Sequence, residues 1–134
     1  MSISNTTENT LLKMLLKGVD PSWRAGATLY VALFTADPGE AGSLVAEATY
    51  TGYTRVALTK ASDWTDNGST FANTNLIQFG ACTAGTNALT HYAVVDTISG
   101  AVNMMITGAL SATLNVSAGI QPQFPAGDLQ VTVD

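Results

Sequence analysis

Charged side chains are scarce in this sequence, and cations are missing from more than half of it. Asp, Glu, Lys and Arg make up 11% of its 134 residues, less than half the usual share of about 25%. All five basic residues lie at or before Lys60, and the remainder carries five aspartates. Binding to a phosphate backbone or an anionic membrane needs clustered Lys and Arg. We therefore expect neither a nucleic acid nor a membrane as partner.

Cysteine and histidine are almost absent, which excludes several kinds of site. A single cysteine, Cys82, allows no internal disulfide, and one Cys with one His cannot form a structural zinc centre. We expect Cys82 to be a small buried residue, and we expect no cofactor. The sequence also shows no secretory signal and no apolar run long enough to span a membrane.

Catalytic motifs are missing as well. The only imidazole is His91, and no nucleophile elbow, phosphate loop or dinucleotide fingerprint occurs. Asp63 and Asp66 flank Trp64 and leave three interpretations open: a calcium loop, a pair of glycosidase carboxylates, or an ordinary turn. Asp66-Asn67-Gly68 is typical of a turn, and the spacing misses the EF-hand pattern. We therefore expect no enzymatic activity.

What the sequence does contain is a polar, nearly neutral surface composition, rich in Thr, Ser, Asn and Gly. Removing water from such a surface costs less free energy than removing it from a highly charged one, which suits a protein that lies against other protein surfaces. A secreted β-rich domain is the alternative. At 13.9 kDa, the chain is long enough for one domain with its own core.

The stretch 27–42 organises the rest of the chain. Residues 27–35 are apolar at both alternating sets of positions, which predicts a strand covered on both faces. The strand is then either central in a two-layer β structure or has one face against another chain. Asp37-Pro38-Gly39 predicts a tight turn at its end.

Residues 5–17 are the one segment with helical character. Leu11, Leu12, Leu15 and Leu16 form an apolar stripe, Asn5 and Glu8 have capping-box spacing, and Gly18 is placed to end the helix. The helix is either a lid on the β core or an arm that docks on a neighbouring subunit. We divide the chain into residues 1–25, helix and linker, and residues 26–134, a β-sandwich domain.

Short β runs separated by Gly, Asn, Ser and Thr clusters fill the rest of the chain. Without a further helix to form crossovers, these strands must pair antiparallel. We expect a mainly β fold, an antiparallel jelly-roll sandwich of about eight strands. The predicted strands are 27–35, 53–59, 76–80, 91–96, 103–110, 113–116, 121–124 and 129–134.

The candidate interface residues are the helix leucines and the aromatic residues of the linker and β runs. We expect Trp23 to anchor the linker after the helix, and a solvent-shielding or interface role for the other aromatic residues; a sugar platform of Trp64, Tyr50 and Tyr53 is the alternative. Because both faces of strand 27–35 are apolar, we expect a dimer or trimer. The candidates are Leu11, Leu12, Leu15, Leu16, Trp23, Tyr30, Phe34, Tyr50, Tyr53 and Trp64.

Five segments together resemble a family of small virion proteins of tailed bacteriophages, labelled tail-fibre or decoration proteins. They are MSIS…EN.LL..LL.G at the start, TLYVALFTADPGEAG, GYTRVAL at 52–58, HYAVVD at 91–96 and FPAGDLQVTVD at 124–134. The resemblance implies a helix followed by a β sandwich like that of jelly-roll cement proteins on icosahedral heads. The segment 67–88 departs from it, being richer in Thr, Asn and Gly.

From this resemblance we expect a non-enzymatic capsid decoration protein. It would be made in the bacterial host cytoplasm, bind the major capsid protein on the outer head surface, and stabilise the head. A tail or fibre-attachment protein is the alternative, and a carbohydrate-binding jelly-roll module is the alternative from another class.

Overall fold

The computed structural model describes residues 2–132 as a mainly β chain with one short helix. Its elements are β1 (Ser2–Ile3), α1 (Asn5–Lys17), β2 (Thr28–Phe34), β3 (Val56–Thr59), β4 (Trp64–Asp66), β5 (Thr70–Asn73), β6 (Ile77–Gln78), β7 (Asn87–Val95), β8 (Met104–Val116), β9 (Gln123–Phe124) and β10 (Gln130–Thr132).

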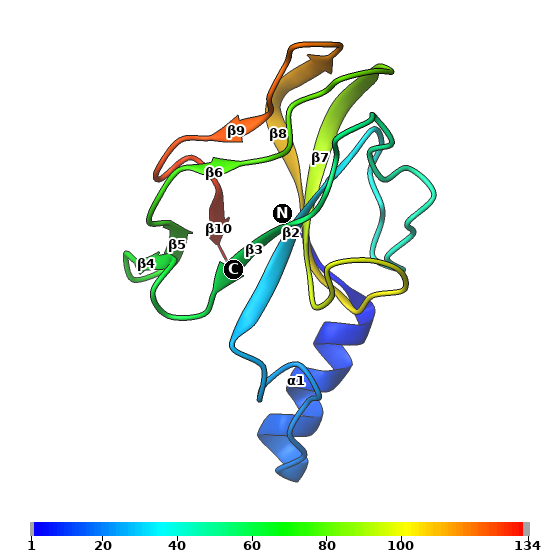
Figure 1. Cartoon of the computed structure of the whole chain (residues 1–134). Coiled ribbons are helices and arrows are strands. Elements are labelled where there is room, and N and C mark those ends of the chain that lie inside the picture. Colours follow the sequence, from blue (N-terminus) through cyan, green and yellow to red (C-terminus); the bar gives the residue numbers. More distant parts are fainter. Residues whose placement is uncertain (1, 133–134) are drawn as a thin grey trace.

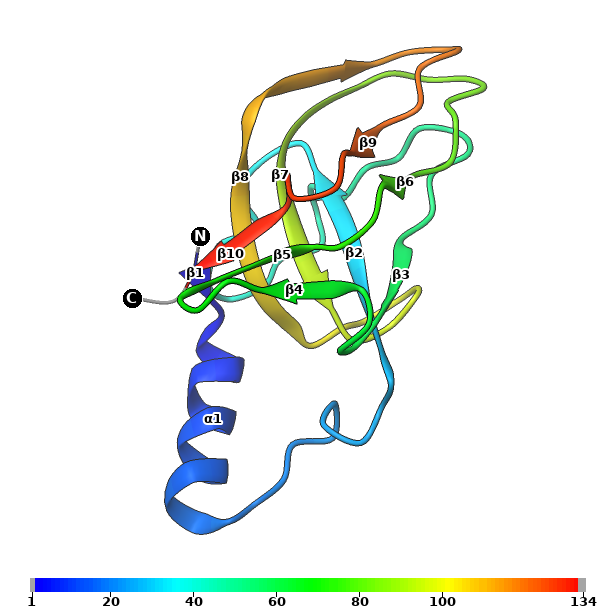
Figure 2. The same ribbon diagram turned by 90° about the vertical axis from the view of Figure 1, so that its left-hand side faces the viewer.

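The strands form one large sheet and two small ones, and every pairing between these strands is antiparallel. The large sheet has the order β1-β8-β7-β2-β3, while β10-β5-β4 and β6-β9 form the small sheets. Figure 2 shows the small sheets facing the large one, with α1 projecting from one end. A jelly roll is not confirmed, because the consecutive strands β7 and β8 pair in one sheet and the second layer is divided.

The predicted strands are confirmed in the centre of the fold and wrong at several edges. The runs 103–110 and 113–116 are a single strand, β8, and β7 begins at Asn87 rather than at His91. Residues 53–55 precede β3 instead of belonging to it. The strands β1, β4 and β5 were not predicted, and residues 133–134 of the last predicted strand lie outside the described residues.

Strand β2 is central, and both of its faces are covered by this chain itself. It pairs with β3 on one side and with β7 on the other. Val31 and Leu33 belong to the core between the two layers, whereas Ala32 and Phe34 belong to a second core on the outer face of the large sheet. Of the two interpretations of this strand, the first is correct, so β2 gives no reason to expect a second chain.

The segment 35–48 covers the outer face. It begins with the predicted turn, in which Gly39 has a φ of 68° and its N–H donates to Asp37 Oδ1 at 2.8 Å. Backbone bonds then hold the segment beside β2, from Thr35 N to Ala46 O and from Ala48 N to Leu33 O, both at 2.8 Å. Figure 1 shows this segment as the loop beside the large sheet, away from the small ones.

Candidate functional site

The helix carries a row of exposed leucines. Leu12, Leu15 and Leu16 are 56%, 73% and 79% exposed, and Val19 just after the helix is 51% exposed. Leu12, Leu15 and Leu16 follow the spacing i, i+3, i+4, so they share one side of the helix, whereas Val19 lies beyond Gly18, whose left-handed conformation ends the helix. We call the three leucines the leucine face. Leu11, the fourth predicted leucine, is only half-exposed.

The leucine face has no partner among residues 2–132, and the lid interpretation is wrong. Thr7 is the one buried residue of α1, and α1 packs only lightly against the sheet, at β8. Figures 1 and 2 both show the helix running away from the sheets. A helix of this length stands out from a domain only where packing or anchoring supports it.

The support comes from the base of α1. Ser4 is the N-cap, and its Oγ accepts from Thr7 N at 3.3 Å, so the cap lies one residue before the predicted Asn5. Ser4 N–H also donates to Met105 O at 2.9 Å, and the Ser4 hydroxyl donates to Met104 O. The preceding strand β1 pairs with β8. The first turn is therefore fixed to the large sheet, while the following turns are free.

The linker after α1 is tied to the end of β3. Gly18 closes the helix with a φ of 65°, as predicted. Lys60 donates from Nζ to Trp23 O, and the same ammonium lies 5.9 Å from the centroid of the Trp23 ring, within range of a cation–π interaction. The half-buried Trp23 thus anchors the linker, as expected, through a residue that the sequence did not indicate.

Two of the other predicted interface residues are buried, and the rest are half-buried. Phe34 and Tyr50 are 0% and 3% exposed, so neither is available to a partner, and Tyr30 is half-buried. Tyr50 donates its hydroxyl to Gly80 O at 2.8 Å and packs edge-on against Tyr53. Tyr50 is therefore not available to the predicted sugar platform of Trp64, Tyr50 and Tyr53.

Tyr53 and Arg55 converge on one carboxylate that pins the outer segment in place. Arg55 Nε and Nη2 donate to the two oxygens of Glu47 at 2.7 and 2.8 Å, and the Tyr53 hydroxyl donates to the same carboxylate at 2.8 Å. Two further bonds from Arg55 reach the carbonyls of Thr97 and Gly100. Burial raises the pKa of Tyr53, and the Glu47 carboxylate raises the pKa of Arg55. The group joins three loops and is structural.

A groove that the sequence did not predict opens between the large sheet and β10-β5-β4. It has a volume of about 410 Å³ and a mostly apolar lining. Trp64 and Phe71 stand on its small-sheet side, and Phe71 is 42% exposed. Polar side chains in its lining come from Lys60 and Asp66. The full lining is Leu29, Lys60, Ala61, Trp64, Asp66, Phe71, Val94, Ile106 and Val131.

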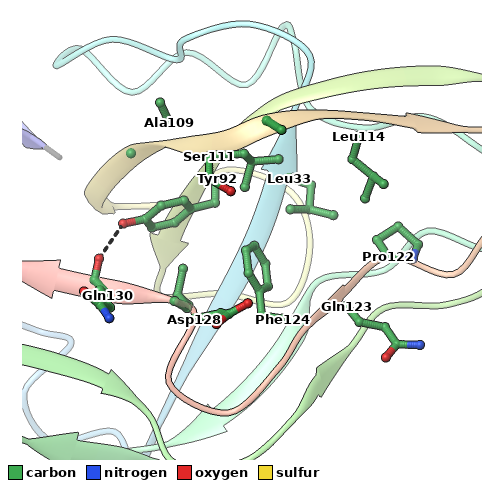
Figure 3. A pocket seen from close by; sticks show the side chains of 14 residues that line it. Leu33, Tyr92, Ala109, Ser111, Leu114, Pro122, Gln123, Phe124, Asp128 and Gln130 are labelled. Atoms are coloured by element: carbon green, nitrogen blue, oxygen red, sulfur yellow. Dashed lines mark hydrogen bonds between the residues drawn. The ribbon is translucent and has the colours of Figure 1, made fainter.

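A second, more polar cleft of about 620 Å³ lies between β8 and the segment 122–130. Figure 3 shows Tyr92 and Phe124 in its wall, with Asp128 and Gln130 beside them. The Tyr92 hydroxyl donates to Gln130 O at 3.2 Å, so it already has a partner. Burial raises the pKa of Tyr92. The cleft offers hydrogen-bonding groups, but its exposed Ser111 and Asp128 form no hydrogen bond with each other, so they are not paired as nucleophile and base.

The remaining candidates for chemistry have structural partners. Asp63 Oδ2 accepts from Thr59 N at 2.7 Å, and Asp66 Oδ1 accepts from Gly68 N at 2.8 Å in the predicted turn, which joins β4 to β5. His91 Nδ1 bonds the neighbouring Thr90 hydroxyl at 2.8 Å. Cys82 is buried, as expected. Within residues 2–132, no three acidic, Cys or His side chains are grouped to hold a metal ion.

The one described helix is too short to cross a membrane.

Comparison with known proteins identifies the family. No curated protein matches the chain. A family model described as podophage GP4 fiber I protein gp80 matches residues 2–132, nearly the whole chain. This match supports the predicted class, a virion structural protein of tailed phages, and it favours the fibre alternative; a place on the outer head surface is not confirmed. The chain belongs to the podophage GP4 fiber I protein gp80 family.

Proposed function

We propose that this protein is a structural, non-enzymatic component of the fibre apparatus of a podophage virion, and that it attaches there through the leucine face of α1. The observation that carries the proposal is the exposure of Leu12, Leu15 and Leu16 on a helix whose base is fixed to the folded domain. Solvent-facing leucines in a contiguous row are typical of interaction sites.

The β domain and α1 contribute differently to the fold, and this difference supports the proposal. The β domain has its own two cores and needs no partner to cover β2. The helix adds little to those cores, since its buried residue is Thr7. A segment that contributes little to the fold yet carries exposed apolar side chains fits an attachment element of the helix-in-groove kind.

A role as a cement protein on the outer head surface, bound to the major capsid protein, is the second candidate. It is favoured by the resemblance of the sequence to decoration proteins and by the weakly charged composition, which suits attachment through buried area rather than ion pairs. Both candidates use the same helix, so they differ in the partner and in the position on the virion.

Particles that lack this protein separate the two candidates. Their tails and heads are purified apart, and tagged wild-type protein is added to each at low and high salt. The proposal expects binding to the tail and fibre fraction, with little loss at high salt because the leucine face is apolar. Binding to heads alone would support the cement role and contradict the fibre proposal.

A further inference from the structure

Strand β8 is paired along only part of its outer edge. In the large sheet its neighbours are β7 on one side and β1 on the other, and β1 pairs with Ile106 and Thr107 alone. Within residues 2–132, no strand lies beside residues 108–116 on that side, and no backbone hydrogen bond outside the strand ladders reaches them. Figure 2 shows this part of β8 at the margin of the large sheet. We call residues 108–116 the open edge.

The open edge lacks the features that keep edge strands apart. Charged side chains and proline commonly prevent the edge of a sheet from pairing with another chain. Residues 97–127 contain no charged side chain, and the open edge contains no proline. A register shift between β7 and β8 also leaves residues 110–113 opposite Thr90 alone. The backbone groups of the open edge are therefore suited to pairing with a further strand.

The side chains of the open edge alternate regularly between the two faces of the sheet. Gly108 and Val116 are buried, and Leu110 and Leu114 are half-buried, whereas the odd-numbered residues between them are all exposed. Ala112 shares the face of the two leucines, yet it is exposed and lines the cleft beside the segment 122–130. The core between the layers is therefore uncovered at the middle of the open edge.

We propose that two copies of this chain join through their open edges, with the two β8 strands antiparallel about a two-fold axis at Ala112. This goes beyond the proposed function, because it concerns contact between copies rather than attachment through α1. Ala112 is the middle residue of the open edge. Pairing about it therefore uses the whole edge of each copy and stops short of the residues that β1 already covers.

The side chains are self-complementary in the same register. Leu110 lies opposite the partner's Leu114, Ser111 lies opposite the partner's Thr113, and Ala112 lies opposite the same residue of the other copy. Apolar pairs and pairs of hydroxyl side chains stabilise neighbouring antiparallel strands.

The chemical pattern and the length of the open edge thus have the same centre. A two-fold contact requires such symmetry, whereas pairing with an unrelated strand does not. The symmetry therefore favours a second copy of this chain as the occupant, and the added strand would cover Ala112.

Cysteine cross-linking tests the contact and its register, because the native Cys82 is buried and 2% exposed. Directly opposite residues of antiparallel strands are close enough for a disulfide. Ala112→Cys should therefore link to itself under mild oxidation, with a yield several-fold above that of Ala41→Cys, an exposed residue outside the cleft. A mixture of Ser111→Cys and Thr113→Cys should link several-fold better than either variant alone.

A charge at the axis gives the matching equilibrium test. Ala112→Lys places two like charges opposite each other and should raise the dissociation constant of the dimer by about 10-fold or more, as measured by analytical ultracentrifugation. Ala41→Lys is the matched control and should leave the dissociation constant unchanged. Circular dichroism checks that each variant is folded.

Three results would overturn the inference. The first is a wild-type protein that stays monomeric at its highest soluble concentration, and the second is a dimer that folded Ala112→Lys leaves intact. The third is preferential self-linking of Ser111→Cys or Thr113→Cys, which would place the axis elsewhere. None of these results would contradict attachment to the fibre apparatus, which the separated tails and heads test independently.

Discussion

Replacing Leu15 and Leu16 by alanine separates folding from attachment. In the isolated chain these side chains are 73% and 79% exposed, so the free energy of unfolding of the monomer should change by no more than about 0.5 kcal/mol. When the leucine face is covered by a partner, each leucine loses most of its exposure. Full burial of a leucine contributes about 1.5–3 kcal/mol, and alanine keeps part of that surface.

The double substitution should therefore weaken attachment by about 2–4 kcal/mol, which corresponds to about 30-fold to 1,000-fold in the dissociation constant. Urea unfolding, followed by circular dichroism below the concentration of self-association, measures the stability, and sedimentation with purified tails measures attachment. Thr6→Ala with Thr10→Ala is the matched control, because those residues lie on another side of the same helix. Loss of more than about 2 kcal/mol of monomer stability would refute the reasoning, since the leucines would then be part of the core; unchanged attachment would refute it as well.

Three further predictions concern the β domain. Arg55→Met should destabilise the fold by about 3–5 kcal/mol, because it leaves the carboxylate of Glu47 without its bidentate partner; a loss below 1 kcal/mol in urea unfolding would contradict this. Gly80→Ala should be at least as damaging, since the new Cβ would lie 1.9 Å from Gly52 O, and a variant with an unchanged melting temperature would show that the two backbones can separate. Stability should also fall as the pH rises above about 10, because burial raises the pKa of three tyrosines, so the folded state holds protons that the unfolded state releases. Absorbance titration beside urea unfolding tests this, and ionisation near pH 10 without loss of stability would contradict it. The three are Tyr50, Tyr53 and Tyr92.

Local signals made α1, β2 and the turn at Gly39 predictable. The leucine spacing, a polar N-terminal cap and Gly18 act within a few residues of one another, so the sequence shows them directly. The predicted N-cap residue was wrong by one position: the N-cap is Ser4 rather than Asn5, since the Ser4 side chain accepts from Thr7 N. The apolar character of 27–35 likewise predicted a strand covered on both faces.

The groove could not be predicted, because it depends on pairings between distant segments. Strand β5 pairs with β10, with Phe71 opposite Val131, and the Thr- and Asn-rich segment around β5 gave no apolar alternation. The interface prediction failed for Phe34 and Tyr50 because distant segments bury them. The segment 35–48 folds back over β2 and covers Phe34 on the outer face, and Tyr50 enters the core between the layers, where its hydroxyl donates to Gly80 O. The helix could be recognised as amphipathic, but its direction away from the domain depends on the contacts of Ser4 with β8.

Cryo-electron microscopy of the intact virion tests the central claim most directly. The account predicts that the β domain is found in the fibre apparatus, with Leu12, Leu15 and Leu16 buried against a neighbouring protein. Density for this protein on the outer head surface would contradict the fibre assignment, and a leucine face that remains open to solvent in the assembled particle would contradict the role of α1 in attachment.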